Sequence, residues 1–220
     1  MHVLYLHGFG SGPLTEKGNR VGARLAGHCT SYAIPDLEGG DFPGLTMDLI
    51  CARAVAATRK LPDDGRGVLL IGSSLGGYTA ALLAARRAIP RLRGMVLIAP
   101  AFNFVSSFRA RLGDEAIAAW VRTGSHPFFH YGTQAEVPLG VAFHNSCSPL
   151  PDLPEQAEVP IAIVHGRQDE TVDYRGSLAY ATDRAAVELH LVQGDHRLTE
   201  PRHEDLIVWC VMDMLRRIHG

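Results

Sequence analysis

The sequence predicts an α/β fold, a mostly parallel sheet of about six strands with helices on both faces. Short apolar runs of strand length alternate with longer segments of helical periodicity along most of the chain, and this alternation is typical of strand–helix–strand units. The chain has 220 residues and is 46% hydrophobic, which is enough for one large core. We therefore expect a single domain over residues 1–220.

Apolar runs supply the strands of the predicted sheet, and most of them are continuous, as expected for strands buried on both faces. They cover residues 3–6, 30–34, 68–71, 95–99, 161–164 and 187–192. The last run alternates apolar and polar residues, so we place it toward an edge of the sheet. Helical periodicity follows most of the runs, over residues 15–26, 44–60, 75–87, 174–184 and 204–218.

One interval is too long for a simple connection between strands. About sixty residues lie between the run that ends near residue 99 and the run that begins at residue 161. This interval holds half of the aromatic side chains of the protein, together with a predicted helix over residues 114–122. We expect residues 102–158 to form a helical cap that packs over one end of the sheet.

A turn with the pattern Gly-x-Ser-x-Gly follows the apolar run at 68–71, with Gly72, Ser74 and Gly76 at its fixed positions. A sharp turn from strand to helix brings the backbone of both glycines too close to its surroundings for a Cβ atom, and it forces the central serine into a strained conformation. The hydroxyl of Ser74 then projects over the sheet as a candidate nucleophile. Ser73 is the weaker candidate, because the glycines are spaced symmetrically about Ser74.

A serine nucleophile needs a histidine base and a carboxylate that orients the histidine. Asp169 follows the run at 161–164 and His196 follows the run at 187–192, so both lie at the carboxyl edge of a parallel sheet, where sites collect. We predict that these two residues complete the catalytic group. Glu170 and Asp173 are alternatives for the carboxylate, and His203 is an alternative base, although it falls in or beside the last helix.

The loop after the first strand, residues 7–13, is rich in glycine and predicts part of an oxyanion hole. We expect the backbone N–H groups of Phe9 and of Leu75, which directly follows the serine, to bind the oxyanion. A nucleotide cradle is the competing interpretation, but Pro13 stands where the dinucleotide pattern needs its third glycine, and a P-loop lysine motif is missing. Phe9 and Tyr78 are the candidate substrate-binding side chains, because they are close in sequence to the oxyanion and nucleophile positions.

Composition and charge exclude several classes of partner. The 21 basic and 23 acidic residues are interspersed and give a net charge of −2, so we expect no binding to nucleic acid. No apolar segment approaches the ~18 residues of a membrane span, so we expect no membrane insertion. The four cysteines lack metal or redox spacing, which favours the cytoplasm. His126 and His130 are four residues apart, as helical metal ligands would be, but Pro127 disturbs a helix there and no third ligand is evident.

Together these residues resemble the α/β-hydrolase superfamily over almost the whole chain. The resemblance depends on His7-Gly8 after the first strand, the turn at residues 72–76, Asp169 behind His165-Gly166, and His196 in a late loop. The opening LYLHGFGSGP, with a lysine shortly after it, is similar to the small bacterial esterases of the YqiA type. This resemblance implies hydrolysis of small-molecule carboxylic esters or thioesters, without a metal or organic cofactor.

The expected reaction runs through an acyl-enzyme on Ser74, with His196 as the base and Asp169 as the residue that orients it. Two other functions stay open. The same three residues would serve an acyltransferase or a perhydrolase, and a hydrolase scaffold is also compatible with a non-catalytic binding protein.

Overall fold

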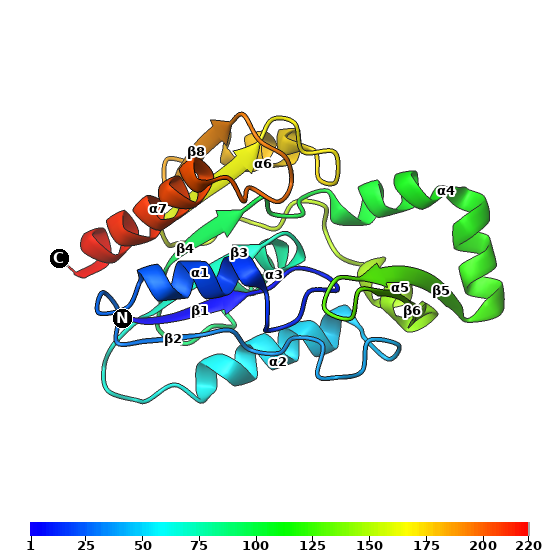
Figure 1. The fold of residues 1–220 in the computed structure, drawn as a ribbon, viewed down its shortest axis with the longest axis horizontal. Coiled ribbons are helices and arrows are strands. Elements are labelled where there is room, and N and C mark those ends of the chain that lie inside the picture. Colours follow the sequence, from blue (N-terminus) through cyan, green and yellow to red (C-terminus); the bar gives the residue numbers. More distant parts are fainter. Residues whose placement is uncertain (220) are drawn as a thin grey trace.

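The computed structural model describes residues 1–219 and has a six-stranded sheet at its centre, with the strand order β2-β1-β3-β4-β7-β8 (Figure 1). All neighbouring strands in this sheet are parallel. The strands are β1 (His2–Leu6), β2 (Ser31–Ala33), β3 (Val68–Ser73), β4 (Leu92–Ile98), β7 (Ile161–Gly166) and β8 (Val187–Val192). The predicted fold class is confirmed, and β8 lies at an edge, as its alternating pattern indicates.

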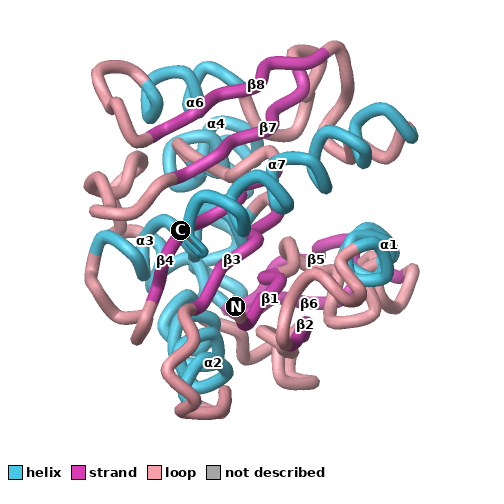
Figure 2. The backbone as a smooth tube through the Cα atoms, turned by 90° about the vertical axis from the view of Figure 1, so that its left-hand side faces the viewer, coloured by secondary structure: helices cyan, strands magenta, loops and turns pink. Residues whose placement is uncertain are grey.

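Successive residues of the central strands point to opposite faces of the sheet and enter two separate cores. Val3 and Tyr5 of β1 belong to one core, and Leu4 and Leu6 belong to the other. The first core lies under the helices α1 (Glu16–Arg24) and α7 (Pro201–His219). The opposite face is covered by α2 (Met47–Arg59), α3 (Leu75–Ala85) and α6 (Tyr174–Ala181), as Figure 2 shows. No helix within residues 1–219 combines the length and the apolar character needed to cross a membrane.

The parallel register gathers the loops that follow β1, β3, β7 and β8 at one edge of the sheet. Leu6 at the end of β1 pairs with Gly72 of β3. Gly166 at the end of β7 pairs with Val192 at the end of β8. Because these strands run in the same direction, the segments that carry the predicted site residues leave the sheet on the same side.

Residues 102–158, which we call the cap, lie beyond the carboxyl ends of the strands (Figure 1). The predicted helix over 114–122 is part of a longer helix, α4 (Phe104–Thr123), which is interrupted at Gly113, where φ is 80°. The sequence predicted neither the antiparallel pair nor the short helix that completes the cap. These elements are β5 (Ser125–His130), β6 (Ala135–Gly140) and α5 (Val141–Cys147). We still predict, from the sequence, that residues 1–220 form a single domain into which the cap is inserted.

The β5–β6 ribbon could not be predicted from the sequence, because its strands contain proline and histidine residues that are not typical of strands. Pro127 of β5 lies opposite Pro138 of β6, and a proline has no N–H to donate to a ladder. A two-stranded ribbon tolerates such residues because each strand has a free edge. His126, Phe128 and His130 are half-buried and alternate with exposed residues, so both histidines lie on a strand instead of on a helix.

Candidate active site

Ser74 forms the turn between β3 and α3 in a backbone conformation that side-chain-bearing residues rarely adopt, with φ 54° and ψ −119°. Such a residue costs about 1–3 kcal/mol and persists only where its surroundings fix it. The Ser74 N–H donates to the carbonyl of Ile98 at 2.9 Å, and the Ser74 carbonyl accepts from the Ala101 N–H at 3.0 Å. Strand β4 and the segment after it therefore hold the strained turn in place.

Glycine is required near Ser74 because the chain passes close to neighbouring backbone. A Cβ atom at Gly72 would lie 2.6 Å from the carbonyl oxygen of Gly76. A Cβ atom at Gly76 would overlap the carbonyl group of Leu6. In the loop after β1, a Cβ atom at Gly8 would lie 3.3 Å from the Cβ atom of Ser74. The Gly-x-Ser-x-Gly spacing thus follows from the close packing of β1, β3 and α3.

The structure brings Ser74, His196 and Asp169 into one hydrogen-bonded chain. Nδ1 of His196 lies 2.7 Å from Oδ2 of Asp169, and Nε2 lies 3.1 Å from Oγ of Ser74. Because an ionised carboxylate only accepts, Nδ1–H of His196 donates to Asp169, which leaves Nε2 free to accept from the serine hydroxyl. The Asp169 side chain is completely buried, whereas 22% of the His196 side chain is exposed. His196 therefore connects the buried carboxylate to the solvent-accessible side of the site.

Backbone amides fix the carboxylate of Asp169. Its Oδ1 atom accepts from the N–H of Thr171 at 2.9 Å and from the N–H of Val172 at 2.7 Å. Burial by itself disfavours the charged form, but the hydrogen bonds from His165 and His196 outweigh it and hold the pKa of the Asp169 carboxyl below its usual range. Asp169 is therefore ionised at neutral pH and is aimed at His196.

His165 is a second histidine on the same carboxylate, and we did not predict this contact from the sequence. Its Nε2 atom lies 3.2 Å from Oδ2 of Asp169, and its Nδ1 atom lies 2.7 Å from the hydroxyl of Ser177 on α6. Both His165 and Ser177 are completely buried. The only sequence signal for this contact was a polar residue inside an otherwise apolar strand.

The alternative candidates lie in other environments. Glu170 is exposed to solvent. Asp173 caps the amino terminus of α6 by accepting a backbone N–H at 2.9 Å. His203 is buried in α7, where its Nε2–H donates to a backbone carbonyl at 2.7 Å. Ser73 is the last residue of β3 and has no positive φ.

The predicted oxyanion donors are the backbone N–H groups of Phe9 and Leu75. Within residues 1–219, the N–H groups of Phe9 and Leu75 donate to no protein acceptor. Phe9 and Leu75 line the same small cavity, of about 10 Å³, together with Gly8 and Gly76. Leu75 directly follows Ser74, and Phe9 follows Gly8, where a Cβ atom would lie 3.3 Å from the Cβ atom of Ser74. The role of the two amides as an oxyanion hole is taken up below as a proposal.

The two predicted substrate-binding side chains have different environments. The ring of Phe9 is half-buried and packs against Phe42 and Phe143, with centroid distances of 5.1 and 5.4 Å. Tyr78 is completely buried, and its hydroxyl donates to the carbonyl of Pro151 at 2.6 Å. A substrate would reach the Tyr78 ring only after the cap moved, so the observed contact of Tyr78 is a link between α3 and the cap.

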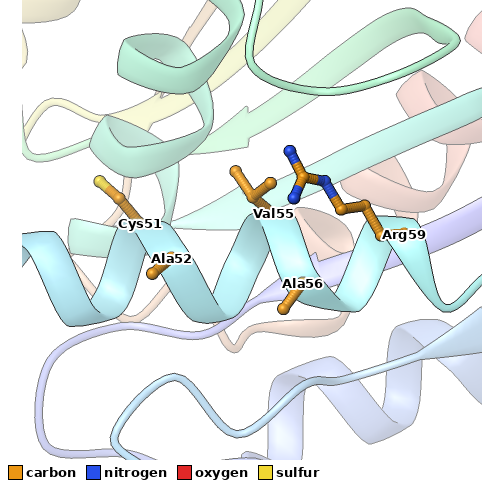
Figure 3. A pocket seen from close by; sticks show the side chains of 5 residues that line it. All are labelled: Cys51, Ala52, Val55, Ala56 and Arg59. Atoms are coloured by element: carbon orange, nitrogen blue, oxygen red, sulfur yellow. The ribbon is translucent and has the colours of Figure 1, made fainter.

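A shallow hollow of about 430 Å³ lies along α2, away from the residues described above (Figure 3). It is lined by Cys51, Ala52, Val55, Ala56 and Arg59. Cys51 is not a competing nucleophile, because burial raises the pKa of its thiol to about 11 and the thiol stays protonated at neutral pH. Within residues 1–219, no three His, Cys, Asp or Glu side chains are grouped to hold a metal ion.

Solved structures define the class of protein to which this fold belongs. The chain is similar to alpha/beta hydrolase domain-containing protein 10 from mouse, at 20% identity and a TM-score of 0.82, over 98% of this chain and 90% of that chain. It is also similar to Est1E from Butyrivibrio proteoclasticus, at 20% identity and a TM-score of 0.71, over 100% of this chain and 88% of that chain. An esterase domain of a Rhodothermus marinus protein is similar at 17% identity and a TM-score of 0.64, over 100% of this chain and 88% of that domain. The fold is that of the α/β hydrolases, and the predicted resemblance to this superfamily is confirmed at the level of the fold.

The family follows from the sequence. Residues 2–207 match the uncharacterised protein family UPF0227, and the chain belongs to this family. No curated protein matches the chain.

Proposed function

We propose that the protein is a serine hydrolase that cleaves carboxylic ester or thioester bonds through an acyl-enzyme on Ser74. The observation that carries this proposal is the hydrogen-bonded chain from Asp169 through His196 to a serine on a strained strand–helix turn. The likeness of the fold to an esterase domain from Rhodothermus marinus supports it. A binding protein would not need a base, an ionised orienting carboxylate and two free amides around one hydroxyl.

The residues of the site account for each step of the reaction. Oγ of Ser74 attacks the carbonyl carbon, Nε2 of His196 takes the hydroxyl proton, and Asp169 stabilises the resulting imidazolium. The carbonyl oxygen becomes an oxyanion that accepts from the N–H groups of Phe9 and Leu75, each worth about 2.7–4 kcal/mol of barrier. His196 then gives its proton to the departing oxygen or sulfur. In the second half, His196 takes a proton from water as the water oxygen attacks the acyl carbon. The bond from this carbon to Oγ of Ser74 then breaks, His196 returns the proton to Oγ, and the acid leaves.

The position of Phe9 supports an apolar group on the substrate. Phe9 precedes Gly10 in the loop whose N–H groups include a proposed oxyanion donor. The Phe9 ring contacts aromatic side chains of the cap, including Phe128 at a centroid distance of 5.6 Å. An acyl chain or leaving group beside the oxyanion would meet this apolar surface. A small-molecule substrate and a cytoplasmic location are part of the same proposal, the latter supported by the four free cysteines.

Labelling with a fluorophosphonate probe tests the proposal. We expect the purified protein to be modified at Ser74, as read by mass spectrometry of the peptide, and to hydrolyse nitrophenyl esters or acyl thioesters. Ser74→Ala should lose both properties, and Ser73→Ala is the matched control that should keep them. A folded wild-type protein that is neither labelled nor active would overturn the proposal. Product partitioning on addition of an alcohol or peroxide would instead identify acyl transfer or perhydrolysis.

A further inference from the structure

Glu38 is a buried acidic residue in the loop between β2 and α2, and it is not part of the hydrogen-bonded chain of Ser74, His196 and Asp169. Only 8% of its side chain is exposed. Oε1 accepts from the N–H of Gly10 at 2.7 Å, and Oε2 lies 2.8 Å from Nε2 of His130 on β5. A buried carboxylate is costly unless it is paired and hydrogen-bonded, and both of its oxygens are used here.

The tautomer of His130 is set by its other ring nitrogen. Nδ1 accepts from the N–H of Thr133 at 3.1 Å, so the ring proton is on Nε2 and is donated to Glu38. Glu38 thus receives one donor from the loop after β1, at Gly10, and one donor from the cap, at His130. These partners are 28 and 92 residues away from Glu38 in the sequence.

Gly10 follows Phe9, whose N–H is a proposed oxyanion donor. The carbonyl of Gly10 also accepts from the N–H of Gly132 in the cap at 3.0 Å. Both polar groups of Gly10 are therefore held, one by Glu38 and one by the β5–β6 turn. Glu38 lines the same small cavity as Phe9 and Leu75, the two residues of the predicted oxyanion hole.

We propose that Glu38 and His130 are positioning residues that fix the loop after β1, and with it the N–H of Phe9, by clamping this loop to the cap. The inference depends on the proposed function, since it concerns the oxyanion hole of the same site. Glu38 supplies the acceptor that orients the loop. His130 keeps that carboxylate in place by donating its Nε2–H to Oε2.

Steady-state kinetics with a soluble nitrophenyl ester test the clamp. A donor displaced by about 1 Å costs on the order of 100-fold in rate, so we expect Glu38→Ala and His130→Ala to lower kcat roughly 10- to 100-fold, with KM changed by less than about threefold. Glu38→Gln keeps an acceptor for Gly10 but turns its NH2 group toward Nε2–H of His130, so it loses the hydrogen bond to the cap and should lower kcat about as much as His130→Ala. A trifluoromethyl ketone, which forms an oxyanion on Ser74, should bind Glu38→Ala more weakly by the same factor as the loss in kcat.

His126→Ala is the matched control. His126 lies on the same strand and the same face as His130 but packs against Trp120 and Phe128 instead of contacting Glu38. We expect this variant to keep the kcat and the ketone affinity of the wild type. If Glu38→Ala does not fold, His130→Ala carries the same test, because its backbone lies on an outer strand of the cap.

Three results would overturn the clamp while the proposed function stands. They are wild-type kcat in folded Glu38→Ala and His130→Ala, an equal loss of kcat in His126→Ala, and a loss of kcat without a loss of ketone affinity. A wild-type protein that is not labelled at Ser74 and does not hydrolyse esters would overturn the proposed function and the clamp with it.

Discussion

The strain at Ser74 predicts that two substitutions of this residue differ in stability. Ser74→Ala and Ser74→Gly both remove the hydroxyl and its hydrogen bond to His196. Alanine retains a Cβ atom and keeps the strain of φ 54° and ψ −119°, whereas glycine adopts positive φ without a steric penalty. Comparing the two variants therefore isolates the strain from the loss of the hydroxyl.

The magnitude follows from two opposing terms. Relief of the strained backbone stabilises the glycine variant by about 1–3 kcal/mol. The greater freedom of glycine in the unfolded chain removes about 0.5–1 kcal/mol of that gain. From the middle of both ranges, Ser74→Gly should therefore be more stable than Ser74→Ala by roughly 1 kcal/mol in the free energy of unfolding. For a domain of this size, that difference raises the Tm by roughly 2–4 °C.

Denaturation in guanidinium chloride, followed by circular dichroism, measures the difference directly. Ser73 provides a matched control, because this neighbouring serine lies in β3 and has no positive φ. At position 73 the order should reverse, and Ser73→Gly should be less stable than Ser73→Ala by about 0.5–1 kcal/mol. If Ser74→Ala were as stable as Ser74→Gly, or more stable, the turn would not be strained, and the reasoning that makes it a nucleophile position would fail.

Further predictions concern packing, charge and thiol reactivity. Gly76→Ala should lower the free energy of unfolding by at least about 3 kcal/mol, since its Cβ atom would overlap the Leu6 carbonyl, and a fully stable variant in denaturant titrations would contradict this. The Asp169 carboxyl has a lower pKa in the folded state than its ordinary value of about 3.9, so the stability that it contributes is present above that pH and is lost on further acidification. Relative to Asp169→Asn, the wild type should lose this advantage in unfolding free energy as the pH falls from about 5 toward about 3, as urea titrations at each pH would show. Burial raises the pKa of the Cys147 thiol to about 12, so iodoacetamide at mildly alkaline pH should modify it far more slowly in the folded protein than after unfolding; equal rates by mass spectrometry would refute this.

Most of the sheet could be predicted from the sequence because its inner strands, β1, β3, β4 and β7, are largely buried on both faces and contain continuous apolar runs. The predicted range 187–192 coincides with β8. Strand β4 begins earlier than predicted, at Leu92, because Leu92 pairs with Val68 across the sheet even though Arg93 and Gly94 interrupt the apolar run. Hydrophobic periodicity indicates which side chains are buried, but it does not indicate which backbone groups pair in a sheet, so the start of β4 could not be predicted from it.

The candidate site divides in the same way. Ser74 could be predicted because its turn is a local pattern, and Asp169 and His196 could be predicted because a parallel sheet places the ends of its strands at one edge. Glu38 and His130 have no such signal. Glu38 and His130 are 92 residues apart in the sequence, and they are in contact only because the β5–β6 ribbon brings His130 to Glu38. Strand propensity does not predict this ribbon, because proline is rare in strands and Pro127 pairs with Pro138.

Hydrogen bonding alone would not have singled out Ser74, because residues 1–219 contain two further Ser–His–Asp chains. Ser31 lies 2.7 Å from Nδ1 of His2, whose Nε2 lies 3.2 Å from Asp64, and Ser177 is connected through His165 to Asp169 with the same two distances.

Three differences separate these chains from the one at Ser74. The imidazole is reversed in both of them, since Nδ1 faces the serine and Nε2 faces the carboxylate. His2 and His165 are 1% and 0% exposed, so no substrate reaches them, and neither Ser31 nor Ser177 has a positive φ. At Ser74 the backbone is strained, Nε2 faces the hydroxyl, and two amides are free beside it. Backbone strain and unpaired donors both cost stability, and a hydrogen bond with a purely structural role requires neither. Their presence together at Ser74 is the physical argument for proposing this serine, of the three, as the nucleophile.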